Sequence, residues 1–205
     1  MVVNGAGAAA IAVLKFLMSA GVKNAILCDS KGIIYEGRKE NMNPIKEEME
    51  KVTNKEMIKG TLADAIVGAD IFIGLSVVGA LSKEMIRSMA SDPIVFAMAN
   101  PIPEIMPAEA KEAGARIIAT GRSDFPNQVN NCLGFSAIFK GALKVRASQI
   151  NEEMKFAAAY AIASIIPEDE LSEENIIPNV FNPKVVEVES EAVAQAAKET
   201  GVARI

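Results

Sequence analysis

Short apolar runs alternate with amphipathic stretches along the first part of this 205-residue chain. The runs are continuous rather than alternating in polarity, and they end near Asp, Gly or Pro, which predicts strands buried on both faces. Strands of this kind, separated by helices, form a parallel sheet that helices cover on both sides. The predicted strands are Met1–Asn4, Ala25–Cys28, Ile71–Leu75, Ile94–Ala99 and Arg116–Ala119.

Helices are predicted between these strands. The first begins soon after residue 4 and runs to about residue 20, where Gly21 ends it. Ser82 is predicted to be an N-cap, because its hydroxyl can accept a hydrogen bond from a first-turn N–H. Residues 30–43 are predicted to form a polar loop. The other predicted helices are Pro44–Val52, Leu62–Val67, Lys83–Ala90 and Glu109–Ala113.

The pattern changes beyond Gly121, where the apolar runs stop. Residues 134–146, 151–165 and 184–200 have helical spacing, and residues 168–177 form an acidic turn or short helix. We therefore predict one α/β domain, a doubly wound parallel sheet with additional C-terminal helices. Its sheet-forming core covers residues 1–122, and residues 123–205 supply a loop and a helical layer.

Composition restricts the chemistry that this domain can perform. The chain contains no histidine, no tryptophan and two cysteines, Cys28 and Cys132. The absence of histidine excludes a Ser–His or Cys–His nucleophile pair and every His-ligated metal site. Two isolated cysteines exclude a disulfide framework and a four-cysteine zinc site, and they are typical of a reducing cytosol.

Charge and hydropathy exclude two classes of partner. Residues 1–150 hold 17 Lys/Arg against 15 Asp/Glu (+2), and residues 151–205 hold 4 against 11 (−7), which together give −5. No basic patch with interleaved aromatic residues occurs, so we expect no nucleic-acid partner. No apolar run reaches membrane-spanning length and the first residues do not resemble a signal peptide, so we expect a cytoplasmic protein with no membrane partner.

A glycine-rich turn follows the first predicted strand. Residues 5–10 match G-x-G-x-x-A. Gly5 permits a tight turn, Gly7 lets a pyrophosphate approach the backbone, and Ala10 is small enough for the helix to pack on the strand. The N–H groups of the helix start then face the phosphates. This motif predicts a Rossmann-type dinucleotide site, although glycine- and alanine-rich helix starts also occur without one.

Asp29 ends the next strand, 24 residues after Gly5. A carboxylate there accepts hydrogen bonds from the adenosine ribose hydroxyls and repels a 2′-phosphate, which favours NAD over NADP. The alternative is a solvated Asp at a strand end. Lys31, two residues later, weakens this discrimination, so NADP remains possible.

Three further polar segments follow strands, around Ser76, Asn100 and residues 120–131. An Asn beside a proline presents an amide in fixed geometry, suited to a carboxamide or a carboxylate, but turn chemistry explains Asn-Pro pairs equally well. Asn130 and Asn131 precede a helix, so capping competes with ligand binding there.

Several segments together resemble one known family. Residues 3–9, Ala99–Glu104 and Gly121–Asn131 are similar to the NAD-binding domain of the bacterial and archaeal malic enzymes. Residues 176–178 and the Ala-rich closing helix are similar too, so the resemblance covers nearly the whole chain. The segment Gly121–Asn131 is the most specific part.

The resemblance implies oxidative decarboxylation of L-malate to pyruvate and CO2 with NAD(P)⁺. It places the pyrophosphate on Gly7, Ala8 and Ala9, and Asp29 at the adenosine ribose. It also implies that Ser76 lies near the cofactor's ribose and Asn100 near the nicotinamide. Asn130, with Asn131, is expected to bind a carboxylate of the substrate.

The family's tyrosine acid, lysine base and metal-binding carboxylates precede the glycine motif, where this chain has four residues. We therefore expect no catalytic residue and no metal ligand in this chain, and an N-terminal domain or partner chain that supplies them with Mg²⁺ or Mn²⁺. A homo-oligomer is also expected. The alternatives are a non-enzymatic NAD-binding sensor or partner module, and the cofactor domain of another dehydrogenase.

Overall fold

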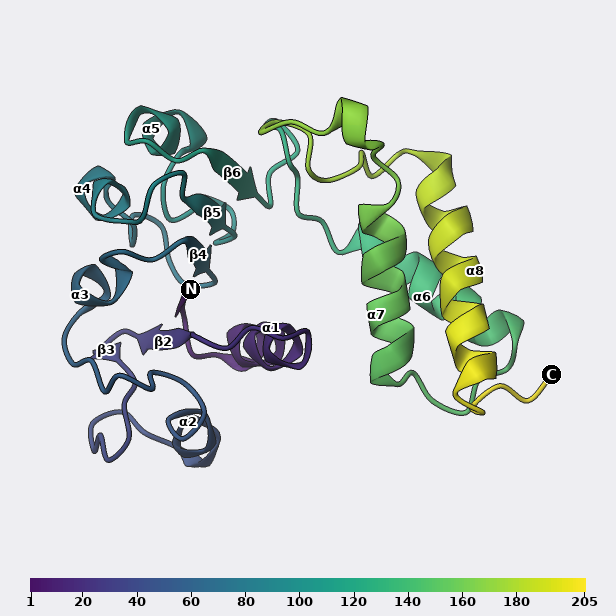
Figure 1. Cartoon of the computed structure of the whole chain (residues 1–205), viewed down its shortest axis with the longest axis horizontal. Helices are drawn as coiled ribbons and strands as arrows, with labels where there is room; N and C mark the ends of the chain where they lie inside the picture. Colours follow the sequence, from purple (N-terminus) through teal and green to yellow (C-terminus); the bar gives the residue numbers. More distant parts are fainter. The chain divides into compact units, whose positions relative to one another are not determined.

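Six short strands form one sheet in the order β3–β2–β1–β4–β5–β6 (Figure 1). Neighbouring strands are parallel except β3, which pairs antiparallel with β2. The strand order reverses between β1 and β4, as in doubly wound sheets that bind nucleotides at that point. The strands are β1 (Val2–Asn4), β2 (Ile26–Asp29), β3 (Gly32–Ile33), β4 (Ile71–Gly74), β5 (Ile94–Ala97) and β6 (Ile117–Thr120).

All 205 residues are described in this computed structural model. The chain divides into two compact units, a first unit Met1–Phe125 and a second unit Pro126–Ile205. None of the helices combines the length and the apolar character that crossing a membrane requires.

Helices cover both faces of the sheet in the first unit (Figure 1). Alternate strand residues explain why: Val2 and Phe72 join a cluster with α3, α4 and α5, while their neighbours Val3 and Ile73 join a cluster with α1 and α2. Successive side chains of a strand point to opposite faces, so a continuous apolar run fills both layers. The helices are α1 (Ala8–Ser19), α2 (Pro44–Met49), α3 (Leu62–Ile66), α4 (Lys83–Arg87) and α5 (Pro107–Glu112).

These elements confirm the predicted strands and helices, with shifts of a few residues at their ends. The predicted N-cap is also confirmed, because the Ser82 hydroxyl accepts a hydrogen bond from the N–H of Met85 at 3.2 Å. The prediction of a loop over residues 30–43 was wrong at its start. Gly32–Ile33 forms the edge strand β3, whose two residues are too few to produce a recognisable apolar run.

Three helices form the second unit around a core of alanine and valine side chains. Helices α6 and α8 approach closely at Gly141, where an added Cβ atom would lie 2.5 Å from the carbonyl oxygen of Ser190. The acidic segment contains a short 3₁₀ helix, as predicted, and the buried amide of Asn127 bonds to backbone groups of Glu173 and Ile176 beside it. The elements are α6 (Cys132–Lys144), α7 (Glu152–Ala163), η1 (Glu168–Glu170) and α8 (Pro183–Glu199).

Candidate cofactor site

The glycine turn connects β1 to α1 and meets the end of β4. Gly5 has a φ of +112°, and an added Cβ atom there would lie 2.4 Å from the carbonyl oxygen of Leu75. A side chain at this position is therefore excluded both by conformation and by contact. Ala10 lies on the buried face of α1, so its small side chain sets how closely the helix packs on the sheet.

Gly7, at the N-cap of α1, is different because space is open in front of it. An added Cβ atom would have no neighbour within 4 Å, and Gly7, Ala8 and Ala9 are exposed. No side chain caps this end of the helix. Its first-turn N–H groups and positive dipole end are thus available to an anion. The turn fits a pyrophosphate, because the surface that a side chain would cover at Gly7 is left clear.

A cavity of about 610 Å³ adjoins the turn at the carboxyl ends of β1, β2 and β4. Its lining includes Gly5, Asp29 and Ser76, three residues that sequence analysis selected separately. The volume is in the range of cavities that enclose small ligands and cofactors. Its position is the one that doubly wound sheets use for nucleotides.

Asp29 is held at the wall of this cavity by four donors. Its carboxylate accepts hydrogen bonds from the Arg38 guanidinium, the Lys46 ammonium at 2.7 Å, the Asn41 amide at 3.0 Å and the backbone N–H of Lys31 at 2.8 Å. The side chain is 6% exposed. Burial acts to raise the pKa of Asp29, but the bonds from Arg38 and Lys46 outweigh it, so the pKa lies below its ordinary value.

Two cations beside one carboxylate change the electrostatic character of this wall. Asp29 contributes one negative charge, and Arg38 and Lys46 contribute two positive charges. The cluster is therefore positive by one charge, and the Asp29 carboxylate is not isolated. Lys31, which sequence analysis considered the local cation, directs its ammonium to Glu40 at 3.1 Å.

Ser76 follows β4 and is fixed by two polar side chains. Its hydroxyl accepts a hydrogen bond from the Asn4 amide at 2.9 Å and donates one to the Glu104 carboxylate at 3.1 Å. Glu104 also accepts from the backbone N–H of Ser76 at 2.9 Å and from that of Ala99 at 3.0 Å. Asn100, the next residue, is exposed in the loop after β5 and does not line the cavity.

Asn130 and Asn131 lie in the second unit, at the start of α6. The Asn130 side chain accepts a hydrogen bond from the N–H of Cys132, the first residue of α6, at 2.9 Å, which is the kind of bond that the capping alternative expected. Asn131 occupies the N-cap position, but its side chain makes no capping bond. Both line a cavity of about 540 Å³ whose other walls are mainly apolar, including Leu133 and Ile138.

Arg38, Lys46 and Glu104 were not predicted from the sequence to be site residues. Arg38 lies in the segment between β3 and α2, and Lys46 lies in α2. Besides Asp29, Arg38 donates to backbone carbonyls of β3 and Lys46 donates to one backbone carbonyl. A cluster of basic residues after an acidic strand end was the available signal. Glu104 ends a segment that carries the family resemblance, but nothing local indicated its burial, because that burial depends on how two separate loops pack.

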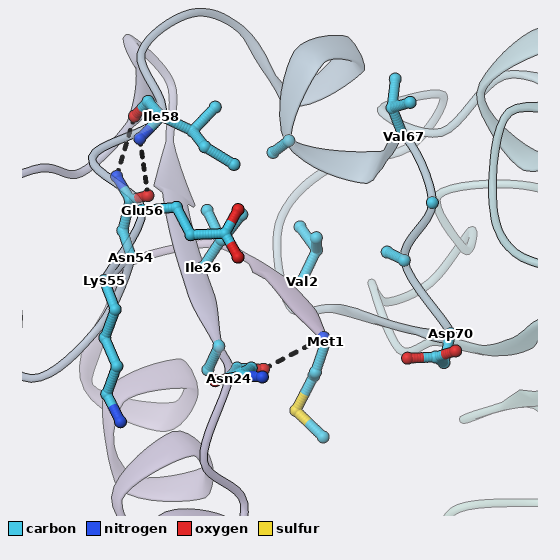
Figure 2. A pocket seen from close by; sticks show the side chains of 14 residues that line it. Met1, Val2, Asn24, Ile26, Asn54, Lys55, Glu56, Ile58, Val67 and Asp70 are labelled. Carbon is cyan, nitrogen blue, oxygen red and sulfur yellow. Dashed lines mark hydrogen bonds between the residues drawn. The ribbon is translucent and has the colours of Figure 1, made fainter.

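A further pocket, of about 260 Å³, opens at the amino ends of β1 and β2, with residues such as Asn24, Asn54 and Asp70 in its wall (Figure 2). The Asn54 amide is bonded there to the backbone of Ile58, at 2.8 Å as donor and 2.9 Å as acceptor. This pocket lies at the opposite ends of the strands from the glycine turn. It is therefore separate from the cofactor site, which doubly wound folds place at the carboxyl ends.

Comparison with known proteins decides the family. The domain described as "Malic enzyme, NAD binding domain" matches residues 1–200. The chain belongs to this family. Its full length is 61% identical to half of the bifunctional malic/malolactic enzyme of Bacillus subtilis, and 56% identical to 42% of the NAD-dependent malic enzyme of Geobacillus stearothermophilus. An NADP-dependent malic enzyme of Rhizobium meliloti is 50% identical, and 28% of it is covered.

Solved structures agree with this malic enzyme assignment. The crystal structure of malic enzyme from Pyrococcus horikoshii superposes with a TM-score of 0.93 at 46% identity, over all of this chain and 49% of that one. The chain thus spans half or less of the relatives it matches. The predicted Rossmann-type fold and the NAD-binding domain of malic enzyme type are confirmed, and the family favours neither a sensor module nor another dehydrogenase.

Proposed function

We propose that this domain supplies the cofactor site for oxidative decarboxylation of L-malate to pyruvate and CO2. The observation that carries the proposal is the cavity at the carboxyl ends of β1, β2 and β4, which the glycine turn, Asp29 and Ser76 line together. The malic enzyme family supports the choice of reaction. When bound, NAD(P)⁺ accepts the hydride that leaves C2 of malate.

Each proposed contact uses a group that the structure leaves accessible. The first-turn N–H groups at Gly7, Ala8 and Ala9 bind the pyrophosphate, and Ala10 keeps the helix seated behind them. The exposed amide of Asn100 supports a contact with the nicotinamide carboxamide.

We assign the substrate carboxylate to Asn130 and Asn131. An Asn amide can donate two hydrogen bonds to a carboxylate, and the Asn130 amide nitrogen keeps this capacity because the oxygen alone serves the Cys132 N–H. Asn131 makes no capping bond, which leaves its side chain for a ligand.

The Asp29 cluster bears on the choice between NAD and NADP. Because Arg38 and Lys46 neutralise the carboxylate, Asp29 does not repel a 2′-phosphate as an isolated carboxylate would. Its Oδ1, which accepts only the backbone N–H of Lys31, can still accept a bond from a ribose hydroxyl, whereas Oδ2 is already used by three donors. We therefore propose that the site accepts both cofactors, with a weaker preference for NAD than Asp29 by itself predicts.

The proposal includes further protein and a metal. We expect the acid, the base and the carboxylates for Mg²⁺ or Mn²⁺ to come from another domain or chain, and we expect a homo-oligomer. Exposed apolar side chains on α6, among them Phe135, Phe139 and Leu143, support contact with further protein. An exposed free thiol at Cys132 is consistent with the proposed cytoplasmic location.

Two experiments test this function. In the first, the purified chain is titrated with NADH and NADPH while the nicotinamide emission is followed, which the absence of tryptophan makes straightforward. We expect both cofactors to bind. No binding of either would overturn the proposal at its first step.

In the second experiment, this chain replaces the half of the Bacillus subtilis relative to which it is 61% identical. The chimera should reduce NAD⁺ or NADP⁺ when L-malate and Mn²⁺ are added. A folded chimera that binds NADH but shows no malate-dependent reduction would contradict the reaction. Malate-dependent NADH production by the chain alone would contradict the expectation that the acid, the base and the metal ligands lie elsewhere.

A further inference from the structure

Glu104 joins two loops at the carboxyl edge of the sheet. It lies between β5 and α5, and its side chain is completely buried. One carboxylate oxygen accepts the N–H and the hydroxyl of Ser76, and the other accepts the N–H of Ala99. The loop after β4 and the loop after β5 are thus held by the same carboxylate.

The end of β4 is shaped around this carboxylate. Gly74 is the last residue of β4, and an added Cβ atom there would lie 2.4 to 2.7 Å from the carboxyl atoms of Glu104. Any side chain at Gly74 would displace the carboxylate. Gly74 pairs with Ala97 across the two strands, so the strands below both loops are already in register. Glu104 continues this alignment beyond the strand ends, because it bonds to the loop after each strand.

The hydrogen bonds of Ser76 also have a fixed direction. A carboxylate can only accept, so the Ser76 hydroxyl proton points to Glu104. The Asn4 amide donates to the same hydroxyl oxygen. One acceptor position remains on this oxygen, while its only proton is already used. Ser76 can therefore receive a hydrogen bond from a hydroxyl group of a ligand in the cavity, but it has no proton left to donate.

We propose that Glu104 is a positioning residue for the nicotinamide half of the cofactor. It acts through Ser76, whose oxygen it orients toward a ribose hydroxyl, and through Ala99, which precedes Asn100. This inference rests on the proposed function, because it assumes that the cavity binds a dinucleotide. It adds that the carboxylate decides the polarity of Ser76 and the spacing of the two loops.

The test compares two ligands on the Glu104→Gln variant. ADP carries the adenosine and the pyrophosphate, whereas NADH also carries the second ribose and the nicotinamide. The glutamine must place its NH2 group against a backbone N–H of Ser76 or Ala99, which loses at least one bond. We expect NADH to bind about tenfold more weakly and ADP to bind within twofold of the unsubstituted chain. The emission of bound NADH should also shift toward that of free NADH.

Glu189→Gln is the matched control, because Glu189 is the other completely buried glutamate and lies in the second unit. It should leave both affinities unchanged. If Glu104→Gln does not fold, Ser76→Ala and Ser76→Thr replace it, because Ala removes the hydroxyl with its bonds to Glu104 and Asn4 but keeps the backbone bond to Glu104. We expect Ser76→Ala to weaken NADH selectively and Ser76→Thr to restore much of the binding.

Three outcomes would overturn the inference. Equal weakening of ADP and NADH by Glu104→Gln would indicate a general structural role. Unchanged NADH binding in Glu104→Gln, or in Ser76→Ala, would show that Glu104 and Ser76 do not position the nicotinamide half of the cofactor. These results leave the proposed function intact, whereas failure of the unsubstituted chain to bind NADH overturns both.

Discussion

The two units each bury one glutamate completely, and they treat it in opposite ways. Glu104 in the first unit accepts hydrogen bonds from three donors. Both carboxyl oxygens of Glu189, on α8 in the second unit, are buried without any hydrogen-bond partner. Burial raises the pKa of Glu189 to about 7, because the charged form loses its hydration and gains nothing in return.

The difference lies in the hydrogen bonds: the Glu104 carboxylate connects the loops of the proposed cofactor site, whereas the Glu189 carboxyl group connects nothing. Around Glu104, the donors come from the loops that carry the proposed cofactor contacts. Around Glu189 no group donates to either carboxyl oxygen, and an added Cβ atom at the nearby Gly134 would lie 3.8 Å from one of them, an ordinary contact. Burial alone therefore does not identify a functional acid; its partners do.

The largest expected effect is on cofactor binding in the first unit. Gly7→Val should reduce NADH binding at least about a hundredfold, since the side chain would occupy the space left for the pyrophosphate. The melting temperature should change little, because nothing lies within 4 Å of an added Cβ atom. Binding is measured by nicotinamide emission and folding by circular dichroism.

Gly141→Val is the contrasting control in the second unit. Its Cβ atom would lie 2.5 Å from a backbone oxygen of α8, so this variant should lose about 3 kcal/mol of stability or more. Retained NADH binding in Gly7→Val, or an unchanged melting curve in Gly141→Val, would contradict the distinction between an open and a closed glycine.

The second prediction is that replacing the two buried glutamates changes the free energy of unfolding in opposite directions. Glu104→Ala should lower the free energy of unfolding by about 3 kcal/mol, because it leaves buried donors unpaired. Glu189→Leu should raise it by about 1–3 kcal/mol, since it removes an unpaired buried polar group. Urea denaturation measures both at pH 7.5. Effects of the same sign would remove the basis of the comparison.

The third prediction concerns pH and follows from Glu189. Its pKa is 4.5 in the unfolded chain and about 7 in the folded one. Between these values the folded state keeps a proton that the unfolded state has lost, so the free energy of unfolding falls as the pH rises, by up to about 3 kcal/mol. Above pH 7 this contribution stays constant.

Urea denaturation at several pH values, for the unsubstituted chain and for Glu189→Gln, checks this dependence. The glutamine variant cannot ionise at this position, so its curve should be flatter between pH 4.5 and 7. Identical slopes for the two proteins would show that Glu189 does not carry the dependence.

The smallest expected effect concerns cofactor choice. Asp29→Ala removes the acceptor for a ribose hydroxyl and frees Arg38 and Lys46 for a 2′-phosphate. The ratio of NADP to NAD affinity should rise about tenfold, which corresponds to about 1.4 kcal/mol. Asp70→Ala, at the amino end of β4, is the control and should leave the ratio unchanged. Equal weakening of both cofactors by Asp29→Ala would contradict a role at the ribose.

Local patterns predicted much of the first unit. Continuous apolar runs predict strands such as Ile71–Gly74, and the Ser82 N-cap predicts the start of α4. The edge strand β3 was missed, because two residues carry no period. Its Gly32 is required by a close approach, since an added Cβ atom would lie 2.2 Å from the carbonyl oxygen of Gly60.

The candidate site was predictable where its chemistry lies within one short segment. Gly5, Gly7 and Asp29 follow from turn geometry and from the spacing between two strand ends. Glu104 was not predictable in this way, since it lies 28 positions after Ser76, with a helix and a strand between them. Its role depends on the contact between two loops, which no local pattern encodes.

The sequence by itself determined the α/β order, the glycine turn and the family resemblance, because each depends on neighbouring residues or on short spacings. Only the tertiary structure decided which charges meet. It placed Arg38 and Lys46 on Asp29, gave Glu104 three donors and left Glu189 with none. The physical reason is that the energy of a buried charge depends on its partners and its distance from water, and folding alone determines both.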